Sequence, residues 1–343
     1  MGSDAPRRFY LLTYPRSASN LLVRILNLDD QNVLPAEDYD GSHAGYFFFQ
    51  AMMLRTRLEL SGKAIGEWTQ DERSQAREAY QKGFDALNNY VNASEARGKL
   101  VFVKEHTPLL VEPVKETNFV HGENTSQETP WVVKTPQGEH QSALNPTILP
   151  DEFLKTWSPT FLIRHPALAY PSLYRAVRDM AEKEGAAVAH PDTLTADMTL
   201  HWSRSLYEFY IDHLQKYPDG TSSAQLDAEF PIILDADDVI AQPAVVLKFA
   251  KMVGLDTSKL KFSWDPTSSE TLEHMRADMK RMLSTLHASS GVVKDKLSTS
   301  IDIDEEAKKW QTEFGDDMAM NLEKWVRAAM PDYEYLKARR LRP

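Results

Sequence analysis

A short polar loop between an apolar run and a helix-like stretch is the first feature of the chain that could do chemistry. Phe9–Thr13 is an apolar run that predicts a buried strand, and Pro15 ends it. Residues 21–26 have the apolar spacing of a helix, which Ser19 or Asn20 is expected to cap. The loop contains, in order, Arg16, Ser17, Ala18, Ser19 and Asn20. A helix N-terminus attracts anions and Arg16 adds a planar charged donor, so the loop is a candidate anion site, although an ordinary turn with an exposed arginine fits the same pattern.

A second arginine ends another predicted strand. Thr160–Arg164 is apolar up to its last residue, and Ser172 follows Arg164 by eight residues. Pro166 and Pro171 fit the start of a helix that would carry Ser172. An arginine fork together with a hydroxyl is well suited to bind a phosphate.

A third predicted strand ends in polar residues. Residues 99–103 are rich in β-branched and aromatic side chains, and Lys104, Glu105 and His106 follow them. Histidine is the side chain whose ordinary pKa lies closest to neutral pH, which suits it to proton transfer. A surface loop would also explain these residues, because the chain has ten histidines.

Together these motifs resemble those of sulfotransferases that use 3′-phosphoadenosine 5′-phosphosulfate (PAPS). The family's phosphosulfate loop has the form Tyr-Pro-Lys/Arg-Ser-Gly-Thr-Thr, and residues 14–20 occupy its place, with Ala18 where glycine is usual and Asn20 where threonine is usual. The steric cost of alanine instead of glycine at position 18 depends on whether the backbone there must adopt a positive φ. The family also has an Arg and a Ser eight residues apart, and a Lys and a His two apart at a strand end. The nucleotide-hydrolysing loop G-x-x-x-x-G-K-[ST] is absent.

The resemblance implies a role for each of these residues. His106 would be the general base for an acceptor hydroxyl, and Lys104 and Arg16 would stabilise charge on the sulfuryl group and the leaving phosphate. The 5′-phosphosulfate would be held by the loop residues Arg16, Ser17, Ala18, Ser19 and Asn20, and the 3′-phosphate by Arg164 and Ser172. PAPS would be the co-substrate, adenosine 3′,5′-bisphosphate (PAP) the product, and no metal would be needed.

The coarse layout predicts an α/β protein. Strands near 9–13, 99–104, 159–163 and 231–235 are separated by helical stretches, which favours a three-layer arrangement with a central, mainly parallel sheet flanked by helices. The resemblance implies the P-loop NTPase-like sulfotransferase fold. We expect one domain over residues 1–343, with a variable loop insertion at 114–149 and a helical C-terminal part at 267–343.

Two local patterns add to this layout. Thr69 and Glu72 have the spacing of a capping box ahead of a long helical stripe. The aromatic run Tyr46–Phe49 fits either the core or an apolar acceptor pocket.

Composition limits the class of protein and its partners. The 343 residues are 42% hydrophobic, and the absence of cysteine excludes disulfides and thiolate metal sites. No apolar run has the length of a membrane span and no signal peptide is apparent, so we expect a cytoplasmic protein with no membrane partner. The net charge of −11 argues against nucleic acid and requires a local basic pocket for an anionic donor.

The function predicted from the sequence is a PAPS-dependent sulfotransferase that acts on a hydroxyl of a small molecule, such as a secondary metabolite. The motifs are nearer to microbial or fungal members than to animal cytosolic ones, which have a Tyr where Ala236 stands and a late Arg-Lys-Gly. One alternative keeps the fold but performs cyclisation or dehydration, with His106 as acid or base. Another is a non-catalytic nucleotide- or metabolite-binding relative, against which the Lys104–His106 pair argues. The sequence does not predict the oligomeric state.

Overall fold

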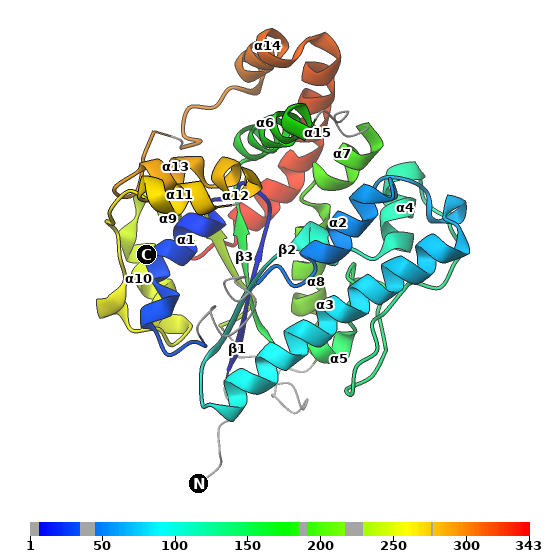
Figure 1. The fold of residues 1–343 in the computed structure, drawn as a ribbon, viewed down its shortest axis with the longest axis horizontal. Coiled ribbons are helices and arrows are strands. Elements are labelled where there is room, and N and C mark those ends of the chain that lie inside the picture. The colour runs from blue at the N-terminus through cyan, green and yellow to red at the C-terminus, as the bar shows by residue number, and fades with distance from the viewer. Residues whose placement is uncertain (1–6, 35–44, 185–190, 217–228, 276, 296) are drawn as a thin grey trace. The chain divides into compact units, whose positions relative to one another are not determined.

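The computed structural model describes residues 7–34, 45–184, 191–216, 229–275, 277–295 and 297–343 (Figure 1). Its centre is a parallel four-stranded sheet in the order β2-β1-β3-β4, flanked by helices, which confirms the predicted α/β class. The strands are β1 (Arg8–Thr13), β2 (Val101–His106), β3 (Ser158–Ile163) and β4 (Ile232–Asp235). In the described part of the chain, no helix is both long and apolar enough to cross a bilayer.

The chain divides into two compact units, which are described separately. The first comprises Met1–Tyr14, Asn32–Phe161 and His190–Ile233, and the second comprises Pro15–Gln31, Leu162–Ala189 and Leu234–Pro343. The single domain over residues 1–343 stays a prediction.

In the first unit, β1 and β2 are paired in parallel along their whole length. The register sets Arg8 opposite Val101 and Thr13 opposite His106. β1 is buried from its second residue to its last, as expected for a strand covered on both faces. The pairing therefore brings the carboxyl ends of two predicted strands to one edge.

α3 is the longest helix among the described residues of the first unit. The capping box is confirmed, because Thr69 accepts from the Glu72 backbone N–H and Glu72 accepts from that of Thr69. α2 and α3 lie side by side (Figure 1). The bounds are α2 (Phe49–Arg57), α3 (Gln70–Ala96), α4 (Pro113–His121), α5 (Asp151–Leu154), α7 (Pro191–Asp197) and α8 (His201–Lys216). The predicted insertion at 114–149 thus begins within α4.

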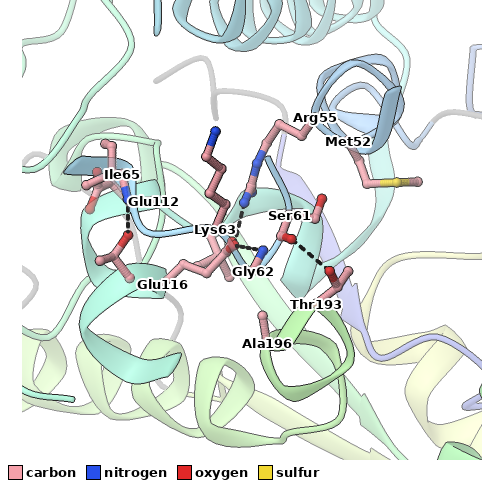
Figure 2. A network of polar contacts seen from close by, with 12 residues as sticks. Met52, Arg55, Ser61, Gly62, Lys63, Ile65, Glu112, Glu116, Thr193 and Ala196 are labelled. Carbon is pink, nitrogen blue, oxygen red and sulfur yellow. Dashed lines mark hydrogen bonds and ion pairs between the residues drawn. The ribbon is translucent and has the colours of Figure 1, made fainter. Parts of the chain in front are cut away.

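A buried ion pair joins α2 to α4. Arg55 donates to Glu116 and to Tyr80 Oη, and the side chains of the ion pair are only 7% and 9% exposed. Figure 2 shows that the Gly62 N–H also points at Glu116, with a donor–acceptor distance of 3.4 Å. Burial alone would lower the pKa of Arg55, but the Glu116 carboxylate outweighs it and raises that pKa, so the guanidinium stays charged.

Removing one partner of this pair should be costly. Glu116→Ala leaves a buried guanidinium without its carboxylate, and we expect the free energy of unfolding to fall by about 3–5 kcal/mol in urea titrations. The control is Glu78→Ala, which breaks an exposed pair with Lys82 and should change stability little. Equal losses in the two variants would contradict the structural role of the buried pair.

The second unit contains the remaining helices. α6 packs against α14 and α15, and Arg175 of α6 pairs with Glu313 of α14. Pro166 begins α6 as predicted, but Pro171 lies inside the helix rather than at its start. The bounds are α1 (Ser19–Leu26), α6 (Pro166–Glu184), α9 (Ala236–Ala241), α10 (Pro243–Met252), α11 (Ser269–His274), α12 (Ala277–Met282), α13 (Ser284–Ala288), α14 (Ile303–Phe314) and α15 (Asp316–Lys337). The described residues of the C-terminal part from 267 onward therefore carry five helices, α11 to α15.

Candidate active site

The loop after β1 turns through two left-handed residues. Arg16 and Ala18 each have a φ of 65°. Ala18 is the N-cap of α1, its carbonyl accepts the Leu22 N–H at 3.0 Å, and no side chain caps this end. The predicted cap at Ser19 or Asn20 is therefore wrong: both lie in the first turn of α1, because the left-handed turn at Ala18 starts the helix one residue earlier. Ser17 and Ser19 are buried, at 0% and 3% exposed.

In the second unit, the structure brings Arg16, Arg164 and Ser172 together. Arg16 Nε donates to Ser172 Oγ at 3.0 Å, and Arg164 Nη1 donates to the Arg16 carbonyl at 2.9 Å. Arg16 Nη1 also donates to the Met282 carbonyl at the end of α12, at 2.6 Å. Two segments far apart in the sequence, which the family resemblance alone related, are thus hydrogen-bonded to each other through the two arginines.

Acidic side chains surround Arg164, and the sequence analysis did not assign them to the site. Burial lowers the pKa of Arg164, and the carboxylates of Asp237 and Asp235 oppose this shift. Asp235 caps α9 and accepts from Tyr333 Oη at 2.8 Å, while Asp237 accepts from the Ser298 N–H at 2.9 Å. The acidic run after β4 was visible in the sequence, but its proximity to Arg164 depends on the fold.

The left-handed Ala18 leads to a stability prediction. Glycine adopts this conformation without steric cost, so Ala18→Gly should raise the free energy of unfolding by about 1 kcal/mol. The matched control is Ala328→Gly at an exposed position inside α15, which should lower it by about 1 kcal/mol. Urea titrations measure both changes, and losses in both variants would show that position 18 is not left-handed in solution.

In the first unit, the end of β2 holds His106 in a defined tautomer. His106 Nδ1 lies 2.6 Å from Thr13 Oγ1, and the same hydroxyl donates to the Glu105 carbonyl at 3.1 Å. When the single hydroxyl hydrogen is directed at the Glu105 carbonyl, Thr13 Oγ1 is left to accept from Nδ1. We therefore assign the proton to Nδ1, which leaves Nε2 as the basic nitrogen.

The other two residues at the end of β2, Lys104 and Glu105, are buried. Lys104 is 3% exposed, and its Nζ lies 4.4 Å from the centroid of the Tyr46 ring. Burial raises the pKa of Glu105 to about 8, against the opposing effect of the backbone N–H groups of Phe48 and His106. Tyr46 Oη lies 3.2 Å from His106 Nε2. Thr13 and Tyr46 are thus contacts of His106 that the sequence analysis did not assign.

The predicted site residues therefore form two groups, each within one unit: the loop with Arg164 and Ser172, and the β2 end with Lys104 and His106. In the sequence, Thr13, which contacts His106, precedes Arg16 by three residues. The basic nitrogen of His106 can take a proton, and the pair Arg16 and Arg164 can bind an anion.

Comparison with known proteins shows the family. No family model matches the chain. Sulfotransferase ppzF of Metarhizium rileyi (strain RCEF 4871) is 45% identical over 337 residues, which is 98% of this chain and 97% of the relative. Sulfotransferase ppzF of Metarhizium majus (strain ARSEF 297) is 44% identical over 339 residues, with 98% and 97% covered. The chain belongs to the sulfotransferase family.

Two solved structures are also similar to this chain at low sequence identity. The sulfotransferase domain from the curacin biosynthetic pathway has a TM-score of 0.33 and 13% identity, with 90% of this chain and 97% of that one covered. The sulfotransferase domain from the Synechococcus PCC 7002 olefin synthase has a TM-score of 0.32 and 12% identity, with 90% and 96% covered.

Proposed function

We propose that the protein transfers a sulfuryl group from PAPS to a hydroxyl of a small molecule, with His106 as the general base. The observation that carries this proposal is the contact of His106 Nδ1 with Thr13 Oγ1 at the end of β2. A general base must present an unprotonated nitrogen to the acceptor, and the Thr13 contact directs the proton to Nδ1 and leaves Nε2 basic.

The donor would bind at the loop and at the arginines attached to it. Arg16, Ser17, Ala18, Ser19 and Asn20 would hold the 5′-phosphosulfate. The left-handed residue Ala18 supports this assignment, since α1 begins there without a side-chain cap and a helix N-terminus attracts anions. Arg164 and Ser172 would hold the 3′-phosphate, and their hydrogen-bonded contacts with Arg16 make them neighbours of the loop.

Charge stabilisation would complete the chemistry. As the bond between sulfur and the leaving phosphate breaks, negative charge grows on oxygens that Arg16 and Lys104 would stabilise. Burial makes Lys104 effective in this role, because a charge interacts more strongly where water is excluded. The acceptor oxygen would attack the sulfur while its proton passes toward His106 Nε2. No metal ion takes part in this scheme.

Donor recognition is tested by nucleotide binding. We expect adenosine 3′,5′-bisphosphate to bind far more tightly than AMP in calorimetric titrations, because AMP lacks the 3′-phosphate. Arg164→Ala should weaken bisphosphate binding about tenfold or more, through the loss of one or two charge-assisted hydrogen bonds, and should hardly affect AMP.

Ser172→Ala is the matched variant, with the same selectivity and a smaller loss. A folding defect would weaken both nucleotides together and lower the melting temperature. If Arg164→Ala weakened both nucleotides equally at an unchanged melting temperature, Arg164 would not bind the 3′-phosphate. If the unmodified protein bound both nucleotides equally weakly, PAPS would not be the donor.

The general base is tested by His106→Gln. This variant should bind adenosine 3′,5′-bisphosphate normally and lose roughly 10²–10⁴ in turnover, the usual contribution of a general base. Turnover is measured as transfer of radioactive sulfate from PAPS to 4-methylphenol, a hydroxyl acceptor that stays protonated near neutral pH. Near-normal turnover would assign the base to another residue.

A further inference from the structure

Tyr46 is held against His106 by the three residues at the end of β2. Its hydroxyl lies 3.2 Å from His106 Nε2, and the two rings have centroids 4.9 Å apart. The Lys104 ammonium group lies 4.4 Å from the Tyr46 ring centroid, which is a cation–π contact. The Glu105 carboxylate accepts the Phe48 N–H at 3.4 Å, two residues beyond Tyr46. Three consecutive residues of β2 thus position Tyr46: Lys104 and His106 contact its side chain, and Glu105 binds the backbone two residues further on.

The backbone at Tyr46 is strained in a way that serves this placement. Tyr46 has a φ of 59°, a left-handed conformation that is a genuine outlier for a bulky residue. Its N–H donates to the Lys104 carbonyl at 3.1 Å, and Gly45 forms a parallel bridge with Lys104. A Cβ at Gly45 would lie 2.0 Å from the Lys104 oxygen, so only glycine fits there. Strain of this kind is typical of functional sites.

The hydrogen bonding at His106 limits how an acceptor can reach the base. Nδ1 carries the proton, so Nε2 has one lone pair, directed outward in the plane of the ring. The neighbouring Tyr46 hydroxyl must then donate to Nε2, since Nε2 cannot donate in this tautomer. An acceptor hydroxyl could therefore reach Nε2 by displacing Tyr46 or through the Tyr46 hydroxyl, and the fixed backbone of Tyr46 favours the second route.

We propose that Tyr46 is a catalytic residue that relays the acceptor proton to His106. The inference rests on the proposed role of His106 as the base. As the acceptor oxygen bonds to sulfur, its proton moves to Tyr46 Oη and the Tyr46 proton moves to Nε2. The bond between sulfur and the PAPS phosphate breaks at the same time, and its electron pair stays on the phosphate. Tyr46 ends neutral and His106 ends as an imidazolium that still donates to Thr13.

The first test is independent of any acceptor. In protein labelled with nitrogen-15 at histidine, the His106 resonances are assigned by their loss in His106→Gln. We expect the nitrogen-15 chemical shift of Nδ1 to be that of a protonated nitrogen. In Tyr46→Phe, the chemical shift of Nε2 should move toward that of a basic nitrogen without a hydrogen bond. Tyr335→Phe removes a hydroxyl from α15 and is the control that should leave both resonances unchanged. An unchanged Nε2 resonance in Tyr46→Phe would overturn the proposal.

The second test separates proton relay from structural damage. Sulfate transfer from PAPS is compared for 4-methylphenol, which stays protonated, and 4-nitrophenol, which is mostly ionised in mildly alkaline buffer. Tyr46→Phe should lower turnover of 4-methylphenol roughly 10²-fold and affect 4-nitrophenol much less, because a phenolate has no proton to lose. Equal losses for both phenols, or no loss for either, would overturn the relay.

The His106→Gln variant distinguishes a failure of the Tyr46 relay from a failure of the proposed base. If it loses turnover of 4-methylphenol while Tyr46→Phe does not, His106 is the base and the relay is absent. If both variants keep full turnover of 4-methylphenol, the proposed role of His106 is wrong as well. Bisphosphate binding in both variants should equal that of the unmodified protein, because the proposal gives neither residue a role in holding the donor.

Discussion

The parallel pairing of β1 with β2 is the constraint on which the candidate site depends. Its register sets Thr13 opposite His106, so the hydroxyl that fixes the imidazole tautomer comes from the strand that leads into the loop. A shift by one residue would turn the side chains of β2 to the opposite face of the sheet and separate His106 from Thr13. The buried residues of β1, and the tilted contact of the Tyr10 and Trp157 rings, whose centroids are 4.8 Å apart, oppose such a shift.

Residues adjacent in sequence do different tasks at the end of β2. Lys104 supplies charge and contacts the Tyr46 ring, Glu105 binds backbone N–H groups, and His106 presents its basic nitrogen. The alternation of side chains along a strand does not separate these residues here, because the segment that begins at Gly45 forms a parallel bridge with Lys104 and contacts all three residues. Burial of Glu105 favours its neutral form near neutral pH, which limits the negative charge beside the base.

The sequence predicted the elements better than it predicted the contacts between distant segments. Apolar runs located all four strands, and the Thr69–Glu72 spacing located the start of α3, because both are local patterns. The helix start at Ala18 was missed since alanine gives no signal for a left-handed residue. Tyr46 belonged to an aromatic run that fits a core equally well, and the acidic residues after β4 carry no local signal for a position near Arg164. Their partners lie far away in the sequence.

The central claim is that the loop after β1 holds the donor, with Arg164 and Ser172 at its 3′-phosphate. A crystal structure of the protein with adenosine 3′,5′-bisphosphate tests this most directly. The account predicts the 5′-phosphate within about 3 Å of the first backbone N–H groups of α1, and the 3′-phosphate within about 3 Å of the Arg164 guanidinium and the Ser172 hydroxyl. A nucleotide bound with neither phosphate at these groups would contradict it.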